Sequence, residues 1–317
     1  PAVAGYCRIY LSRYLIFTVP ILLMNNFTLY MIAAGKSALS MVCSITGGIL
    51  NIVLDYVFIS ILDMGIAGAA IATGLGYSVT AVAGLVIFSK KDCLLHFVKP
   101  VCRIRTLVSA ASNGSSEMAA ALVTGIVTMM FNWTMLKYVG ENGVAAITII
   151  MYVLMFATSL YTGYSYGVAP MISFYYGEQN QDKLKKLIRL SMKIIGFIGA
   201  AALMVSLAVT EPLVAIFARP DNPVYDLAVT GNRICSSALV FIGFNVFASG
   251  MFTALSNGLV SAVLAFSRSF VFMVAAMLIL PAILGVTGAW LATPAAEAAA
   301  FLLSAVMFIK YRKKYQY

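Results

Sequence analysis

The chain has 317 residues, of which 62% are hydrophobic and only 10% are charged, and its mean hydropathy is +0.96. This composition excludes an ordinary soluble globular protein, and repeated apolar runs of about twenty residues or more are typical of a polytopic helical membrane protein. The formal charge of +10 is a poor sign of nucleic-acid binding, because the basic stretches lack interleaved aromatic residues. Since the chain begins at Pro1 without a signal peptide, we expect its N-terminus to be processed, engineered or missing.

The apolar runs predict an all-α protein with nine membrane-spanning helices. Three of them are longer than a bilayer needs and are expected to tilt, kink or project. Pro20, Pro170 and Pro281 are candidate kink sites. The predicted helices cover residues 6–34, 38–61, 66–88, 106–138, 143–176, 184–209, 225–255, 259–284 and 286–309.

A polar cluster is predicted where the second and third helices run antiparallel. Asn51 and Asp55 are four residues apart and therefore share a helix face. With the hairpin tip near residue 63, Asp55 lies ~12 Å and Thr73 ~15 Å from the tip. A carboxylate, an amide and a hydroxyl at similar depth supply hard oxygen ligands for Na⁺ or groups for a proton relay. The alternative is a hydrogen-bond cluster that only joins two helices; an ionisable carboxylate inside a membrane span favours an ion site.

The basic residues are distributed unevenly between the two sets of loops. Sixteen of the 21 lie in one set, in which we include Arg268 and the C-terminal tail. The positive-inside rule places that set and the C-terminus in the cytoplasm. The other set holds only five basic residues: Arg8, Arg13, Lys137, Arg219 and Arg233.

An internal repeat relates the first three predicted helices to the last three. The segment from Gly65 to Thr73 recurs from Gly285 to Thr293, an offset of 220. Repeated halves are typical of secondary transporters, and an advance of six spans makes this a parallel repeat. The same offset relates Arg13 to Arg233, Asn25 to Asn245, Phe27 to Phe247, Met31 to Met251 and Lys90 to Lys310.

The repeat predicts two lobes of unequal completeness. Residues 1–99 would form the last three helices of an amino lobe, and residues 100–317 a complete carboxy lobe of six helices. We therefore expect three further helices upstream of Pro1, giving twelve in all. A reading frame that starts within a few codons of Pro1 would refute this expectation.

Five motifs carry a resemblance to a transporter family. The chain resembles the multidrug and toxic compound extrusion (MATE) transporters, and in particular their bacterial MepA-like branch. The resemblance implies two six-helix lobes around a central cleft, with substrate expelled in exchange for Na⁺ or H⁺. The motifs are Asn51-x3-Asp55, Gly65-x2-Gly68-Ala69-x2-Ala72-Thr73, Asn113-Gly114-Ser115-Ser116-Glu117, Gly163-Tyr-Ser-x-Gly167-Val-Ala-Pro170 and Tyr176-Gly177-Glu-Gln-Asn180.

The resemblance also implies roles for individual residues. Asn51, Asp55 and Thr73 match three residues of the family's amino-lobe cation site. A fourth member, an Asp on the family's first helix, has no counterpart in this chain. The acidic positions that some relatives use on the seventh and tenth helices are not clearly matched. The corresponding helix here carries the neutral Asn245, which is a candidate coupling or substrate residue of the second lobe.

Two further acids fall inside predicted spans. Glu297 lies in the last helix, where the first copy of the repeat has Tyr77. Its carboxyl group could be held neutral or paired within the helical bundle. Alternatively, it could bind a proton or cation that drives transport in the second lobe. Glu117 either braces a helix near the cytoplasmic mouth or attracts a cationic substrate. Gly163 and Gly167 are expected to permit close helix packing.

Enzymatic chemistry has little support in the sequence. His96 is the only histidine and lies in a predicted loop, and the five cysteines lack metal-ligand spacing. No nucleotide phosphate-binding motif is present. The sequence therefore predicts a cofactor-free, monomeric, cation-coupled exporter of hydrophobic organic cations in the bacterial cytoplasmic membrane, with Na⁺ or H⁺ bound at Asn51, Asp55 and Thr73. A lipid-linked precursor flippase of related architecture is the alternative, and it would need a cleft lined with basic residues.

Overall fold

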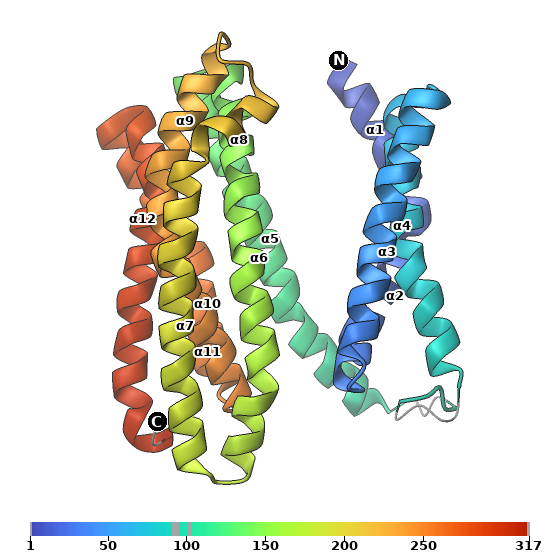
Figure 1. Ribbon diagram of the computed structural model, residues 1–317, viewed down its shortest axis with the longest axis vertical. Helices are drawn as coiled ribbons and strands as arrows, with labels where there is room; N and C mark the ends of the chain where they lie inside the picture. The colour runs from blue at the N-terminus through green and yellow to red at the C-terminus, as the bar shows by residue number, and fades with distance from the viewer. Residues whose placement is uncertain (1, 91–94, 100–102, 316–317) are drawn as a thin grey trace. The chain divides into compact units, whose positions relative to one another are not determined.

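The computed structural model describes residues 2–90, 95–99 and 103–315, and the regular structure in these ranges is helical (Figure 1). The chain divides into two compact units, Pro1–Arg103 and Ile104–Tyr317. We call them the amino unit and the carboxy unit and describe each by itself.

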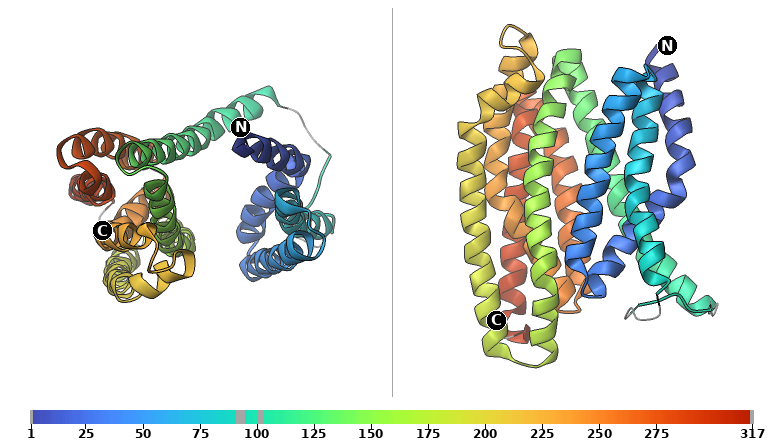
Figure 2. Two further views of the ribbon diagram at one scale, coloured as in Figure 1. Left: turned by 90° about the horizontal axis from the view of Figure 1, so that it is seen from above. Right: turned by 45° about the vertical axis from the view of Figure 1, so that its right-hand side comes forward.

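The amino unit consists of three helical rods. Its helices are α1 (Ala2–Tyr14), η1 (Leu15–Phe17), α2 (Thr18–Ala33), α3 (Ser37–Asp55), η2 (Tyr56–Ile61) and α4 (Gly65–Phe88). The 3-10 segment η1 joins α1 to α2, and the π-helical segment η2 continues α3. Figure 2 shows α3 and α4 side by side in both views, as expected for a hairpin with a turn of three residues between Ile61 and Gly65. A small core holds the three rods together through Phe27, Met31, Cys43 and Phe88.

The carboxy unit is built from longer helices. They are α5 (Ile104–Tyr138), α6 (Glu141–Gly177), α7 (Gln181–Ala208), α8 (Thr210–Phe217), α9 (Pro223–Cys235), η3 (Ser236–Ala238), α10 (Leu239–Ala254), α11 (Gly258–Phe266), η4 (Ser267–Phe272) and α12 (Met273–Tyr315). Asparagine side chains begin three of these helices, because an Asn oxygen can accept from a free amide of the first turn. Asn180, Asn222 and Asn257 accept from the backbone N–H groups of Lys183, Val224 and Val260, respectively.

Helix α12 is folded back on itself at Gly285. This residue has φ 58° and ψ −133°, a combination that glycine adopts most readily. The chain rises through α11 and the first part of α12 and returns to the C-terminus through the second part (Figure 1). Gly288 allows the two parts to approach, because a Cβ there would collide with the Leu280 carbonyl and with Pro281 N.

The helices have the length and composition needed to cross a membrane. Seven helical segments of the described residues qualify, and the last of them, Gly258–Tyr315, comprises two rods joined at Gly285. Helix α5 adds a further rod of 35 residues. The prediction of an all-α membrane protein with nine spans is therefore confirmed for the described residues.

The repeated segments share local structure as well as sequence. A 3-10 segment interrupts the first rod of each copy, at Leu15–Phe17 and at Ser236–Ala238. Positive φ values occur at Gly65 and Gly285, which are 220 residues apart, and at Gly35 and Ser256, which are 221 apart. The offset therefore differs by one residue between the two loops of the repeat.

Two local expectations were wrong. Arg268 lies in η4, within a continuous helical rod rather than in a loop, because an ion pair described below holds its charge. Gly163 and Gly167 mediate no close packing among the described residues of the carboxy unit, since a Cβ at either position would meet none of their atoms within 4 Å. The expected kink at Pro170, which lies within α6, stays a prediction.

Candidate cation sites

Asn51 lies where α3 and α4 approach closely. A Cβ added to Gly47 would lie 2.6 Å from the Gly76 carbonyl oxygen, and one added to Gly76 would lie 3.0 Å from Cβ of Asn51. The missing side chains let the two backbones touch, and this contact directs the Asn51 side of α3 toward α4. Asp55 follows one turn later, at the last residue of α3 before the π-helical η2. Such π turns frequently occur at functional sites.

Two polar atoms of this cluster are buried without a hydrogen-bond partner among the described residues. They are Oδ1 of Asp55 and Nδ2 of Asn51. The third predicted member, Thr73, donates its hydroxyl to the Ala69 carbonyl of its own helix at 2.9 Å. The structure therefore places Asn51 and Asp55 on one face of α3, and no hydrogen bond links Thr73 to either of them.

An unpaired buried carboxylate oxygen is costly, since it loses its hydration without gaining a donor. A bound cation or a proton on Asp55 would remove this cost. A half-turn of the Asn51 amide would replace its unsatisfied nitrogen with its carbonyl oxygen, the atom that a hard cation prefers. The residues present therefore fit a small cation or a proton better than they fit a neutral interhelical cluster.

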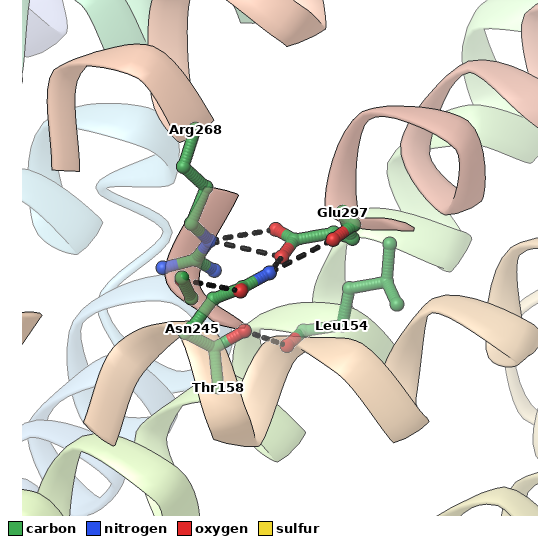
Figure 3. A network of polar contacts seen from close by, with 6 residues as sticks. Leu154, Thr158, Asn245, Arg268 and Glu297 are labelled. Carbon is green, nitrogen blue, oxygen red and sulfur yellow. Dashed lines mark hydrogen bonds and ion pairs between the residues drawn. The ribbon is translucent and has the colours of Figure 1, made fainter. Parts of the chain in front are cut away.

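A second polar network lies inside the carboxy unit, between α10, η4 and α12 (Figure 3). Nε of Arg268 donates to both carboxylate oxygens of Glu297, at 2.8 and 3.0 Å. Nδ2 of Asn245 donates to Oε2 of Glu297 at 2.8 Å and to the Glu297 carbonyl at 2.9 Å. Ser304 donates its hydroxyl to Oδ1 of Asn245 at 3.1 Å. We call these four residues the carboxy-unit network.

The carboxy-unit network is buried and its charges balance. Asn245, Glu297 and Ser304 are only 2%, 4% and 4% exposed, and the Arg268 side chain is 21% exposed. Glu297 and Asn245 stand out in the sequence as polar residues inside predicted spans, whereas Arg268 was counted among the loop residues. Its position as the only charged residue between 259 and 284 could have revealed it, since charges inside spans usually have a partner there.

Breaking this ion pair should strongly destabilise the carboxy unit. We expect Glu297→Ala to lower the free energy of unfolding by about 3 kcal/mol, because it leaves the largely buried Arg268 charge without a partner. Glu211→Ala breaks the ion pair to Arg233, whose side chains are 60% and 54% exposed, and should cost less than about 1 kcal/mol. Thermal denaturation of both variants in detergent tests this difference, and equal losses would contradict it.

Among the described residues, the remaining candidates form no further site. The Glu117 side chain lies outside the described residues, so its predicted role stays a prediction. His96 is exposed. Cys43 and Cys235 are buried free thiols and Cys7 is an exposed one; among the described residues no group of three or more His, Cys, Asp or Glu side chains could hold a metal.

A cavity of about 880 Å³ lies in the carboxy unit between α5, α6 and the segment from α8 to α9. Aromatic and aliphatic side chains dominate its lining, including Trp133, Phe217 and Met129. Glu141 is the only ionisable residue among its lining residues. This composition suits an apolar ligand with one positive charge.

Comparison with known proteins decides the family. The model of the MatE family matches residues 117–279, just over half of the chain. The chain belongs to the MatE family. The match begins within α5 and ends within α12, so it includes Asn245 and Arg268 but neither Asp55 nor Glu297.

Curated relatives extend the similarity of this MatE protein to most of its length. The multidrug export protein MepA of Staphylococcus haemolyticus is 25% identical over 88% of this chain and 61% of its own length. MepA of Staphylococcus aureus strain RF122 is 23% identical over the same shares. The chain therefore spans about three-fifths of the length of these relatives.

Solved structures show the same fold. An inward-facing multidrug resistance MATE transporter matches with a TM-score of 0.83 at 22% identity, over 100% of this chain and 73% of that one. An outward-facing structure with the same description matches with a TM-score of 0.82 at 23% identity, over 92% and 66%. At this identity the likeness concerns the fold alone.

Proposed function

We propose that this MatE protein exports hydrophobic organic cations by alternating access, in exchange for Na⁺ or H⁺ bound at Asp55. The observation that carries the proposal is the buried Oδ1 of Asp55, which has no hydrogen-bond partner among the described residues. A carboxylate that needs a cation, placed inside a membrane span, is a group whose charge can be exchanged during transport. Asn51 and Thr73 would assist as neutral ligands.

The contrast between the carboxylates of Asp55 and Glu297 supports placing the coupling ion at Asp55. Glu297 accepts from Arg268 and Asn245, so its charge is already balanced within the chain. Asp55 makes no ion pair among the described residues. An incoming cation would therefore gain more at Asp55 than at Glu297, where it would first have to displace a guanidinium.

Three features support organic cations as the exported substrates. The relatives described above are named multidrug export proteins. The carboxy unit has an apolar, aromatic cavity with a single carboxylate, Glu141, at its wall. Arg268, a basic residue inside a span, contributes no net positive charge because it is paired with Glu297. The flippase alternative requires uncompensated positive charge to hold a pyrophosphate.

Dye accumulation tests the substrate class. Expression of the complete gene product in an efflux-deficient bacterial host is expected to lower ethidium accumulation, because the dye is flat, apolar and cationic. The Asp55→Asn variant in the same host is the control for passive effects of expression. If no cationic dye responds although membrane insertion is demonstrated, the flippase alternative is favoured instead.

A further inference from the structure

Each unit places a carboxylate in a repeated helical hairpin, at a similar distance from its turn. Asp55 lies ten residues before Gly65 and Glu297 lies twelve residues after Gly285, or ~15 and ~18 Å along a helix. Asp55 has no partner for Oδ1, whereas Glu297 is bound by Arg268. We propose that the Arg268 guanidinium replaces a bound cation, so that the carboxy-unit network is a cation site filled by the chain itself.

Arg268 places a positively charged group between the two carboxylate oxygens of Glu297, where a bound metal cation would lie. Its single Nε–H group is shared by both oxygens of Glu297, at 2.8 and 3.0 Å (Figure 3). A small cation bound to the two oxygens would take the same central position. The two terminal amino groups of Arg268 make no hydrogen bond among the described residues, so Glu297 holds the guanidinium by one edge only.

The other members of the network are suitable ligands for a small cation. Asn245 and Ser304 bring an amide and a hydroxyl to the carboxylate, and both are almost completely buried. Reversal of the Asn245 amide would turn its oxygen toward Glu297. A carboxylate with amide and hydroxyl oxygens is a donor set that suits Na⁺. Without Arg268, the Glu297 carboxylate would be left needing such a cation.

The repeat shows why only one unit contains this arginine. Ser40 and Ser261 correspond at an offset of 221, because each forms a hydrogen bond to the rod that precedes it. At the same offset, the position of Arg268 corresponds to Gly47. In the amino unit a Cβ at Gly47 would lie 2.6 Å from the Gly76 carbonyl oxygen, so no side chain fits there. The amino unit must therefore bind a cation from solution, whereas the Arg268 side chain supplies the positive charge in the carboxy unit.

The consequence concerns ion exchange. With Arg268 in place, the carboxy-unit network contributes a fixed charge pair and no exchangeable ion. The inference rests on the proposed function only in treating Asp55 as the exchangeable site. Removing Arg268 should convert Glu297 into a second exchangeable site.

Sodium-dependent thermal stability of the purified complete protein tests the proposal. All variants carry Asp55→Asn, which removes any sodium response of the amino unit, and are compared in sodium and choline chloride at one alkaline pH. The parent should show no sodium-dependent change in Tm. Adding Arg268→Met should produce a rise of about a few degrees in sodium, because sodium binds the folded state. Adding Glu297→Gln as well should abolish the rise.

Arg233→Met is the matched control, since Arg233 forms the exposed ion pair of the same unit with Glu211; it should give no sodium response. The proposal is overturned if Arg268→Met gains no response, if the gain survives Glu297→Gln, or if Arg233→Met gains it equally. Arg268→Gln, which retains a donor for the carboxylate, serves if the methionine variant does not fold. Failure of both variants to fold even in sodium also overturns it. Transport is not measured, so an error in the coupling role of Asp55 would not produce these outcomes.

Discussion

Asp55→Asn is expected to abolish transport against a gradient while the complete protein still inserts into the membrane and binds substrate. The substitution preserves the size of the side chain and removes the charge that would hold the coupling cation. Because Oδ1 of Asp55 has no partner in the described structure, no internal hydrogen bond or ion pair at that atom is lost. The measurement is ion-driven dye uptake into everted membrane vesicles, together with dye binding to the purified protein.

Substitutions of nearby residues provide the comparison for the effect of Asp55→Asn on transport. Asn51→Ala and Thr73→Ala each remove one neutral ligand and leave the charge, so they should weaken ion affinity by about tenfold or less. Asn25→Ala should have no effect, since Asn25 is exposed and donates only to the Ile21 carbonyl of its own helix. Wild-type transport with unchanged ion dependence in Asp55→Asn would refute the assignment and make Glu297 or Glu117 the better candidate.

Gly288→Ala is expected to prevent stable folding of the carboxy unit. The added Cβ would overlap the Leu280 carbonyl and approach Pro281 N to 2.8 Å. Both are backbone atoms within the folded α12, so no side-chain rotation relieves the overlap. A loss above about 3 kcal/mol is expected, measured as a fall in Tm and in the yield of monodisperse protein.

Gly163→Ala is the matched control for that substitution. A Cβ at Gly163 would meet no atom within 4 Å, and alanine in a helix is favoured over glycine by about 0.5–1 kcal/mol. The control should therefore raise Tm slightly. A Gly288→Ala variant with wild-type Tm would show that the two parts of α12 can separate without penalty.

The helices could be predicted closely because membrane spans are governed by length and local composition. The predicted span 66–88 differs by one residue from α4, Gly65–Phe88, and 38–61 differs by one at its start. The 3-10 segments that interrupt these rods were harder to predict from the sequence. Leu15–Phe17 precedes Pro20, but Ser236–Ala238 has the same 3-10 geometry without a proline after it.

The candidate sites could be predicted only in part, because their partners are distant in sequence. Glu297 and Asn245 were identified as polar residues inside spans, but their mutual hydrogen bond joins positions 52 residues apart. Arg268 was assigned to a loop because a charge-counting rule considers each basic residue alone. Its pairing depends on how η4 packs against α12, which no local pattern encodes. Likewise, the sequence could not show that Oδ1 of Asp55 has no hydrogen-bond partner among the described residues, because this depends on the packing around it.

The one-residue difference in the repeat offset has a geometric consequence for how the two copies diverged. Thirty residues separate Gly35 from Gly65, but only twenty-nine separate Ser256 from Gly285. In a helix of 3.6 residues per turn, one residue corresponds to a rotation of about 100°. Asp55 therefore corresponds to Ala275 when positions are counted from the turn at Gly65, and to Ala276 when they are counted from the turn at Gly35, and these two residues face different directions.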